Sequence, residues 1–259
     1  FIYIGDTLRC PYGDRSAEEI ASFVDQLTAW LINQGADAIV MACNTSAARA
    51  KKQARRESPV PTFDLLTPTA WHIATSGMKK VGVLATASTA QSHAFARSIN
   101  VLADDIEVIE VGCPLLVPVV EAGLSKSKEA VEALRVYVLE LIEASVEAII
   151  YGCTHYPFLE AALKKVLRKF APYEIAIINP ADLLAEGLGR QSVMTAASYE
   201  NTLFVTTGDA ETFTSIASQC LETKIHNVAN LPLSKLLTVI EPLPTLTVES
   251  KPVAYPFIL

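Results

Sequence analysis

Gly152-Cys153-Thr154-His155-Tyr156-Pro157 stands near the middle of the chain and has an earlier counterpart, Ala42-Cys43-Asn44-Thr45. Residues 36–45 align with residues 146–155 without gaps, and both segments carry Ala-Ile followed directly by a related aliphatic residue (Val40 or Ile150), with the cysteine three positions later. Each copy is an apolar run typical of a buried strand, then a cysteine, then polar residues that begin a helix. A repeat of this kind predicts two related halves, each with a thiol at the same place.

The position of these two cysteines has a chemical consequence. Ligands of open α/β sheets bind beyond the carboxyl ends of the strands, and a nearby helix N-terminus favours the thiolate. Two thiols that face each other across a cleft could take a proton from one face of a carbon atom and supply one to the other. The pattern therefore indicates a racemase or epimerase with Cys43 and Cys153 as its acid–base pair. The alternative is that both are small buried apolar residues, as free cysteine often is.

Apolar runs alternate with helical patterns along the chain, which is typical of α/β proteins with parallel sheets. The repeat predicts two similar lobes, each a parallel-type sheet flanked by helices, related by a pseudo-twofold axis with the active site in the cleft. We expect the first lobe to comprise residues 1–67 and 179–231, and the second to comprise 68–178. Residues 232–259 are rich in proline and predict an extended arm without a regular helix.

Composition excludes several classes of function. The 259 residues carry a net charge of −7, which argues against nucleic acid as a partner. No apolar run has the length of a membrane span. The five cysteines are odd in number and include no C-x-x-C, so they predict neither a disulfide framework nor a zinc site, and they fit a reducing cytoplasm. A metal site made of the two repeated cysteines and His155 has too few ligands, and we predict no metal.

Shorter motifs add candidate residues. Ser16 and Glu19 form a capping-box pattern at the start of a helix. The small and hydroxyl residues 86–89 end a strand, and they predict either an anion-binding turn that includes Thr86 or a plain helix cap. Glu121 lies in an apolar setting and is either a surface residue or a carboxylate directed at a neighbouring site. Cys113 we interpret as structural.

With these motifs in hand, the chain resembles the glutamate racemases of the cofactor-independent aspartate/glutamate racemase superfamily. The shared motifs occur in the family's order over about the first 210 residues: Gly5-Asp6-Thr7, Pro11-Tyr12-Gly13, Ala42-Cys43-Asn44-Thr45, Gly112-Cys113-Pro114 followed by Glu121, Gly152-Cys153-Thr154-His155-Tyr156-Pro157 and Thr206-Thr207-Gly208-Asp209.

The resemblance implies a two-base mechanism without a cofactor. Cys43 would deprotonate D-glutamate, Cys153 would act as the acid on the other face, and the roles would exchange for L-glutamate. His155 would assist the second cysteine, and Glu121 would support the acid–base chemistry. The substrate-binding residues expected from the resemblance and from the strand-end turn are Pro11, Tyr12, Gly13, Asn44, Thr45, Thr86, Thr154 and His155.

The resemblance also implies a biological setting. Glutamate would be the small-molecule partner, the enzyme would be a homodimer, and D-glutamate would serve peptidoglycan synthesis in a bacterial cytoplasm. Family members begin with a strand that ends in an Asp-Ser-Gly loop, which we expect before Phe1, and we predict that the chain without it is poorly stable and weakly active. Two alternatives stay open: a racemase for aspartate or another small amino acid, and a catalytically inactive binding protein on the same fold.

Overall fold

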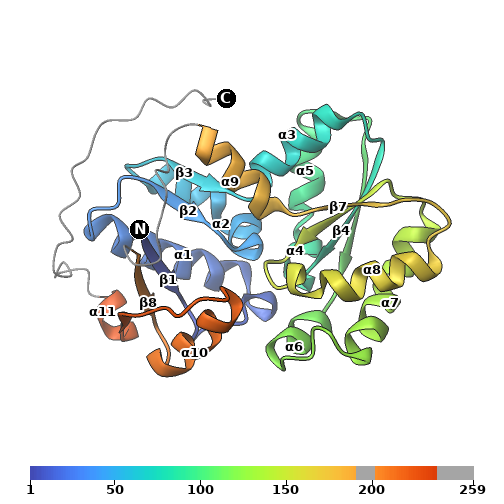
Figure 1. Cartoon of the computed structure of the whole chain (residues 1–259). Helices are drawn as coiled ribbons and strands as arrows, with labels where there is room; N and C mark the ends of the chain where they lie inside the picture. The colour runs from blue at the N-terminus through green and yellow to red at the C-terminus, as the bar shows by residue number, and fades with distance from the viewer. Residues whose placement is uncertain (191–201, 238–259) are drawn as a thin grey trace.

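The computed structural model describes residues 1–190 and 202–237, which form two α/β lobes side by side (Figure 1). All the strand pairs in both lobes are parallel, and helices pack against them. The predicted fold class is therefore confirmed. The lobe boundaries at 67/68 and 178/179 stay a prediction.

The first lobe holds two small sheets among the described residues. One has the order β1-β8-β9 and the other pairs β2 with β3. The strands are β1 (Ile2–Gly5), β2 (Ile39–Met41), β3 (Thr62–Asp64), β8 (Leu203–Thr206) and β9 (Val228–Asn230). The helices of this lobe are the 3-10 helix η1 (Tyr12–Asp14), α1 (Ala17–Asn33), α2 (Asn44–Glu57), α10 (Ala210–Cys220) and α11 (Leu233–Leu237).

The second lobe is built on one sheet with the strand order β5-β4-β6-β7. Its strands are β4 (Lys80–Ala85), β5 (Glu107–Gly112), β6 (Ala148–Gly152) and β7 (Ala176–Ile178). Its helices are α3 (Leu66–Ser76), α4 (Ala87–Ser92), α5 (Ala94–Asn100), α6 (Leu116–Glu121), α7 (Lys128–Glu143), the 3-10 helix η2 (Tyr156–Leu159) and α8 (Glu160–Phe170). Helix α9 (Pro180–Arg190) follows β7 and lies where the two lobes meet (Figure 1).

Both faces of the second lobe's sheet are buried, which explains the continuous apolar runs of its strands. Leu84 and Ile149 point into a core shared with α7 and α8. Their neighbours Val83 and Ile150 point into the opposite core, shared with α3 and α5. Ala47 of α2 belongs to this second core, so the helix that follows Cys43 packs directly on the other lobe.

The helix-start signals in the sequence are confirmed. The Glu19 N–H donates to Ser16 Oγ at 3.1 Å, and the Ser16 N–H donates to Glu19 Oε2 at 3.0 Å. A cap of this kind contributes about 1 kcal/mol to helix stability. Asp209 likewise begins α10 by accepting a hydrogen bond from the Thr212 N–H at 2.7 Å.

One local expectation was wrong. No regular helix was expected after Leu231, yet residues 233–237 form α11, because Leu236 is buried against Trp30 and a tertiary contact stabilises the short helix. The remainder of the proline-rich arm, residues 238–259, lies outside the described residues. After Cys153 the chain forms the 3-10 turn η2, which contains Pro157, and α8 begins at Glu160.

Candidate active site

The two repeated cysteines occupy matching places at the carboxyl ends of strands in different lobes. Cys43 follows β2 and is the N-cap residue of α2, with an extended backbone (φ −110°, ψ 123°). Cys153 follows β6 directly. Cys43 is half-buried, whereas Cys153 is only 7% exposed. The structure thus places each thiol where an α/β sheet binds its ligands.

Gly152 allows the second cysteine its position. A Cβ atom added at Gly152 would lie 2.8 Å from the Leu84 carbonyl oxygen and 2.8 Å from Val83 Cγ1, both in the adjacent strand β4. No side chain fits there without a shift of the sheet. The corresponding residue before Cys43 is Ala42, which is exposed.

Cys153 stands at one end of a chain of polar side chains. His155 Nδ1 lies 3.7 Å from Cys153 Sγ, and His155 Nε2 lies 2.6 Å from Glu121 Oε1. Glu121 is the last residue of α6. Its carboxylate contacts the histidine, although the side chain is also exposed to solvent. Hydrogen bonds at both ring nitrogens orient the imidazole toward the thiol, an arrangement suited to proton transfer at sulfur.

The two thiols also lie within electrostatic range of each other. Burial raises the pKa of the Cys153 thiol to about 12, a backbone hydrogen bond at His155 lowers it, and negative charge on Cys43 raises it. Cys153 is therefore a protonated thiol at neutral pH. A protonated thiol on one side of a carbon atom and a thiolate on the other is the state that a two-base racemase needs at the start of a turnover.

Around Cys43, the side chains that follow it are buried and polar. Asn44 is 2% exposed and Thr45 is 4% exposed. Among the described residues, Asn44 Oδ1 is buried without a hydrogen-bond partner. An unpaired buried acceptor costs about 1–3 kcal/mol, so a ligand that donates a hydrogen bond, such as an ammonium group, would satisfy it.

Three hydroxyl groups form a triangle across the lobes beside the first cysteine. The Thr45 hydroxyl oxygen, on α2, lies 3.1 Å from the Thr86 hydroxyl oxygen and 3.1 Å from that of Thr89. The Thr86 and Thr89 hydroxyl oxygens are 3.0 Å apart. All three residues are buried. Thr86 is also the N-cap of α4, which bears out the helix-cap interpretation of the strand-end turn, and its anion-binding role stays a prediction. Sequence reasoning did not select Thr89 as a site residue, although the run of residues 86–89 contained it.

The loop at Pro11-Tyr12-Gly13 approaches the same hydroxyl triangle. A Cβ atom at Gly13 would lie 3.2 Å from Thr86 Cβ, so the backbone comes close because Gly13 lacks a side chain. The Tyr12 ring is buried, and its hydroxyl donates to Asp6 Oδ2. The Tyr12 hydroxyl is therefore engaged by Asp6, which leaves the backbone of the loop as the part that approaches the hydroxyl triangle.

Two predicted residues have plainer surroundings. Thr154 is exposed beside Cys153. Cys113 is 1% exposed, and its thiol donates to the Val111 carbonyl at 3.3 Å, which fits its interpretation as structural.

A polar hollow opens between the lobes beside the loop. It is lined by residues of η1, the start of α1, α2 and α4, namely Gly13, Asp14, Arg15, Ser16, Ala17, Arg49, Ala87, Ser88 and Gln91. Arg49 bridges the lobes there, since its Nε donates to Ser88 Oγ at 3.0 Å and its Nη2 to the Ser88 carbonyl at 2.7 Å.

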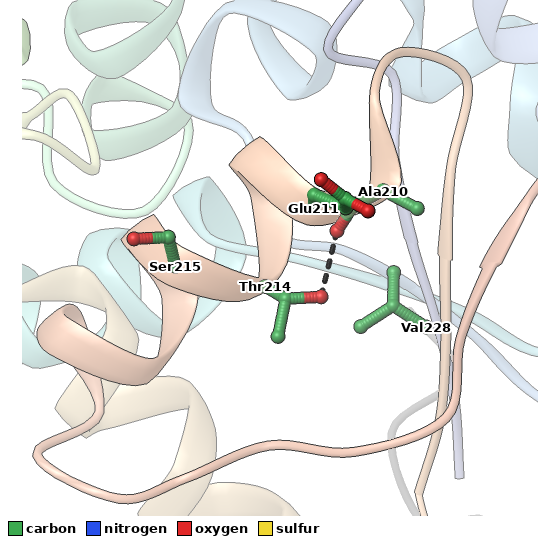
Figure 2. A pocket seen from close by; sticks show the side chains of 5 residues that line it. All are labelled: Ala210, Glu211, Thr214, Ser215 and Val228. Carbon is green, nitrogen blue, oxygen red and sulfur yellow. Dashed lines mark hydrogen bonds between the residues drawn. The ribbon is translucent and has the colours of Figure 1, made fainter.

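A second hollow lies in the first lobe, between α10 and β9 (Figure 2). Thr214 there donates to the Ala210 carbonyl at 2.6 Å, and Glu211 is the single titratable side chain of its lining. Neither cysteine of the repeat lines it, and we assign it no role.

Metal-binding clusters and membrane spans are both absent from the described part of the chain. In residues 1–190 and 202–237, no cluster of three His, Cys, Asp or Glu side chains is arranged to hold a metal ion. Within the same residues, no helix has both the length and the hydrophobicity of a membrane span.

Comparison with known proteins gives a consistent set of matches. Residues 2–188 match the family described as Asp/Glu/Hydantoin racemase. The glutamate racemase of Trichodesmium erythraeum is 34% identical over 226 residues, which cover 85% of this chain and 81% of the relative. The crystal structure of glutamate racemase isoform RacE1 from Bacillus anthracis superposes with a TM-score of 0.80 at 33% identity, covering 90% of this chain and 87% of that one. Glutamate racemase from Francisella tularensis, solved in complex with D-glutamate, gives a TM-score of 0.80 at 28% identity, over 90% of this chain and 88% of that chain.

Proposed function

The chain belongs to the Asp/Glu/Hydantoin racemase family, and on that premise we propose that it interconverts L-glutamate and D-glutamate, with Cys43 and Cys153 exchanging the α-proton. The observation that carries the proposal is the pair of matching strand-end thiols, one of them joined to His155 and Glu121. The relatives named above are glutamate racemases, which supports glutamate as the substrate.

The reaction begins with Cys43 as thiolate and Cys153 as thiol. For D-glutamate, Cys43 Sγ takes the α-proton, so the C–H bond breaks, an S–H bond forms and the electron pair stays on the α-carbon. Cys153 then gives its proton to the opposite face of that carbon. Cys153 becomes a thiolate, and a hydrogen bond donated by the His155 ring beside it stabilises the new charge. For L-glutamate the same steps run in reverse.

An ordinary thiol, with a pKa of about 8.5, is a weak base for an amino-acid α-proton. The site must therefore stabilise the carbanion, whose negative charge spreads into the substrate carboxylate. The hydroxyl triangle of Thr45, Thr86 and Thr89 is a set of fixed donors beside Cys43, and the backbone of η1 approaches that triangle at Gly13. Donors held in place before the reaction stabilise developing charge most effectively, so we assign them to the carboxylate, and the Asn44 amide oxygen to the ammonium group.

The wider setting follows from the same proposal. The five cysteines are all free, and free thiols persist in a reducing cytoplasm, where we place the enzyme. We propose that it acts as a homodimer and supplies D-glutamate for peptidoglycan synthesis, as the resemblance implies. The mechanism uses side chains alone and requires no carbonyl cofactor.

The test follows D- and L-glutamate in deuterium oxide by NMR and circular dichroism, without added cofactor. We expect racemisation with uptake of one α-deuterium, and a loss of at least about 10³-fold in kcat for both Cys43→Ala and Cys153→Ala. Cys220→Ala is the matched control, because Cys220 is an exposed free cysteine on α10, and it should retain full activity.

Each other outcome identifies an alternative. Exchange with aspartate at a higher kcat/KM than with glutamate would assign the substrate differently within the family. A folded protein that exchanges neither amino acid would support an inactive binding protein. Retention of activity in either cysteine variant would overturn the two-thiol mechanism while leaving the racemase family unchanged.

A further inference from the structure

We propose that Asp6 is a positioning residue, which holds the substrate loop Pro11-Tyr12-Gly13 in place through the Tyr12 hydroxyl. The inference rests on the proposed function for its effect on glutamate, but its structural part can be tested without turnover. The proposal gives a role to Asp6 of the Gly5-Asp6-Thr7 motif, a motif that takes no part in the proposed proton transfers.

Asp6 is a buried carboxylate whose two oxygens are both occupied. Its side chain is 5% exposed and comes directly after β1. Oδ2 accepts hydrogen bonds from Arg9 Nε at 2.6 Å and from the Tyr12 hydroxyl, and Oδ1 accepts from the Thr207 hydroxyl at 2.8 Å. A carboxylate removed from water needs such partners to remain charged. Because its oxygens are taken by these donors, Asp6 acts through them and does not itself exchange a proton with the substrate.

Arg9 neutralises the buried charge and is itself fixed. Its Nη1 donates to Gln26 Oε1 at 2.6 Å, and its guanidinium carbon lies 4.1 Å from the centre of the Phe23 ring. Both partners belong to α1. The carboxylate is thereby tied to the helix that packs behind the loop, so its position is set by the fold of the first lobe.

Tyr12 transmits that position to the loop. Its ring is 8% exposed, belongs to the core cluster of Ile20 and Val24, and lies 5.6 Å from the Phe23 ring. Burial raises the pKa of Tyr12, as does the hydrogen bond to Asp6, so the phenol stays a neutral donor. The Tyr12 side chain therefore anchors the loop to the core of the first lobe, while the backbone of the loop approaches Thr86 at Gly13.

The front of the same loop lies against the expected substrate site. Gly13 approaches Thr86 so closely that a Cβ atom would lie 3.2 Å from Thr86 Cβ, and the Thr86 hydroxyl lies 3.1 Å from that of Thr45. A shift of the loop would therefore move the N–H groups of η1 relative to the hydroxyl triangle. Misplacement of binding groups by about 1 Å is enough to cost on the order of 100-fold in rate.

Thr207 extends the network to a distant part of the chain. Besides donating to Asp6, its hydroxyl oxygen accepts from the Leu8 N–H at 3.1 Å. Thr207 follows β8, so the contact joins segments 201 residues apart. The loop is in this way held from both β1 and β8, which makes Asp6 the junction of three segments.

The experiment compares Tyr12→Phe with wild type and with Tyr173→Phe. Tyr173 is the matched control, since its hydroxyl also makes one hydrogen bond, to the Ile142 carbonyl at 3.0 Å, but in the second lobe. We expect KM for both glutamate enantiomers to rise about 10-fold in Tyr12→Phe and kcat to fall about 10-fold, because the loop donors bind the carboxylate in the ground state and also stabilise the charge that develops on it. The control should leave KM unchanged.

A double-mutant cycle locates the effect in the Asp6 contact. Asp6→Asn and the double variant with Tyr12→Phe should show KM values within about twofold of each other, because residues acting through one contact are not additive. If the KM effects of the two single variants multiply instead, Asp6 does not act through Tyr12 and the proposal is overturned. An unchanged KM in Tyr12→Phe overturns it as well.

Hydrogen exchange tests the loop independently of turnover. The Arg9 N–H donates to the Asp6 carbonyl, and the Arg15 N–H to the Tyr12 carbonyl, so both amides report on the loop. Tyr12→Phe should speed their exchange about 10-fold, and Tyr173→Phe should not. Unchanged exchange overturns the positioning role even if glutamate is a substrate. Faster exchange in a protein that does not racemise glutamate would retain the positioning role and reject the proposed function.

Discussion

The two cysteine half-sites begin alike and are supported differently. Cys43 is the N-cap residue of an α-helix and is followed by two buried polar residues. After Cys153 the chain instead passes through an exposed threonine and His155 into a 3-10 turn. The first thiol thus faces the positive end of α2, whereas the second has a histidine and a carboxylate beside it.

The difference indicates how a repeated fold produces an asymmetric site. The strand and the cysteine are common to both halves, so they set where the thiols lie. In the proposed mechanism, charge is stabilised by a helix terminus at Cys43, and at Cys153 by His155, which contacts Glu121 of α6. We expect Cys43 to start as the base and Cys153 as the acid, and the predictions below test that division.

Removing the histidine should cause the largest change. His155→Asn should lower kcat about 100-fold, because positioned acid–base groups contribute about 10²–10⁴-fold. The enantiomers have equal free energies, so kcat/KM must fall equally in both directions. The asymmetry should appear in the primary deuterium isotope effect, which we expect to be larger for L-glutamate, where Cys153 removes the proton. The control is His72→Asn, which alters an exposed histidine on α3. Equal isotope effects in both directions for His155→Asn would contradict the assignment of Cys153 as the acid.

The residues before the cysteines offer a stability test. Gly152→Ala should lower the free energy of unfolding by about 1–3 kcal/mol, because its Cβ would meet the Leu84 carbonyl oxygen at 2.8 Å. The matched change at the first half-site, Ala42→Gly, should cost less than about 1 kcal/mol, because Ala42 is exposed. Urea unfolding followed by circular dichroism measures both, and equal losses would show that the sheet adapts to the added methyl group.

Alkylation should distinguish the two thiols. With a pKa of about 12, Cys153 carries roughly one thiolate in ten thousand at pH 8, and the thiolate is the form that reacts. Cys43 is half-buried at a helix start, so iodoacetamide should label it at least about 10-fold faster, as measured by peptide mass spectrometry. In urea the two rates should converge. Faster labelling of Cys153 in the folded protein would reverse the assigned roles.

The smallest effect is expected at the end of the polar chain. Glu121→Gln should lower kcat about fivefold, because the Glu121 side chain is 59% exposed and solvent weakens its interaction with His155. The control Glu132→Gln breaks a comparable exposed pair with Arg135 and should leave kcat unchanged. A loss as large as that of His155→Asn would mean that the carboxylate is essential to the imidazole's function.

Much of this molecule was predictable because its signals are local. Apolar runs marked the strands, and the Ser16–Glu19 pair marked the start of α1, since a cap uses groups only three residues apart. The repeat placed both cysteines after strands because the two copies align without gaps. The short helix α11 was missed for the opposite reason, since the packing of Leu236 against distant Trp30 stabilises it.

By itself, the sequence determined the α/β class, the two related halves and the place of a cysteine after a strand in each half, because periodicity and repetition are carried by neighbouring residues. The tertiary structure alone decided which side chains meet: Glu121 with His155 across 34 residues, Asp6 with Thr207 across 201, and Thr45 with Thr86 and Thr89 between the lobes. Such contacts depend on how strands and helices pack, and the energy of packing is shared among residues far apart in the chain.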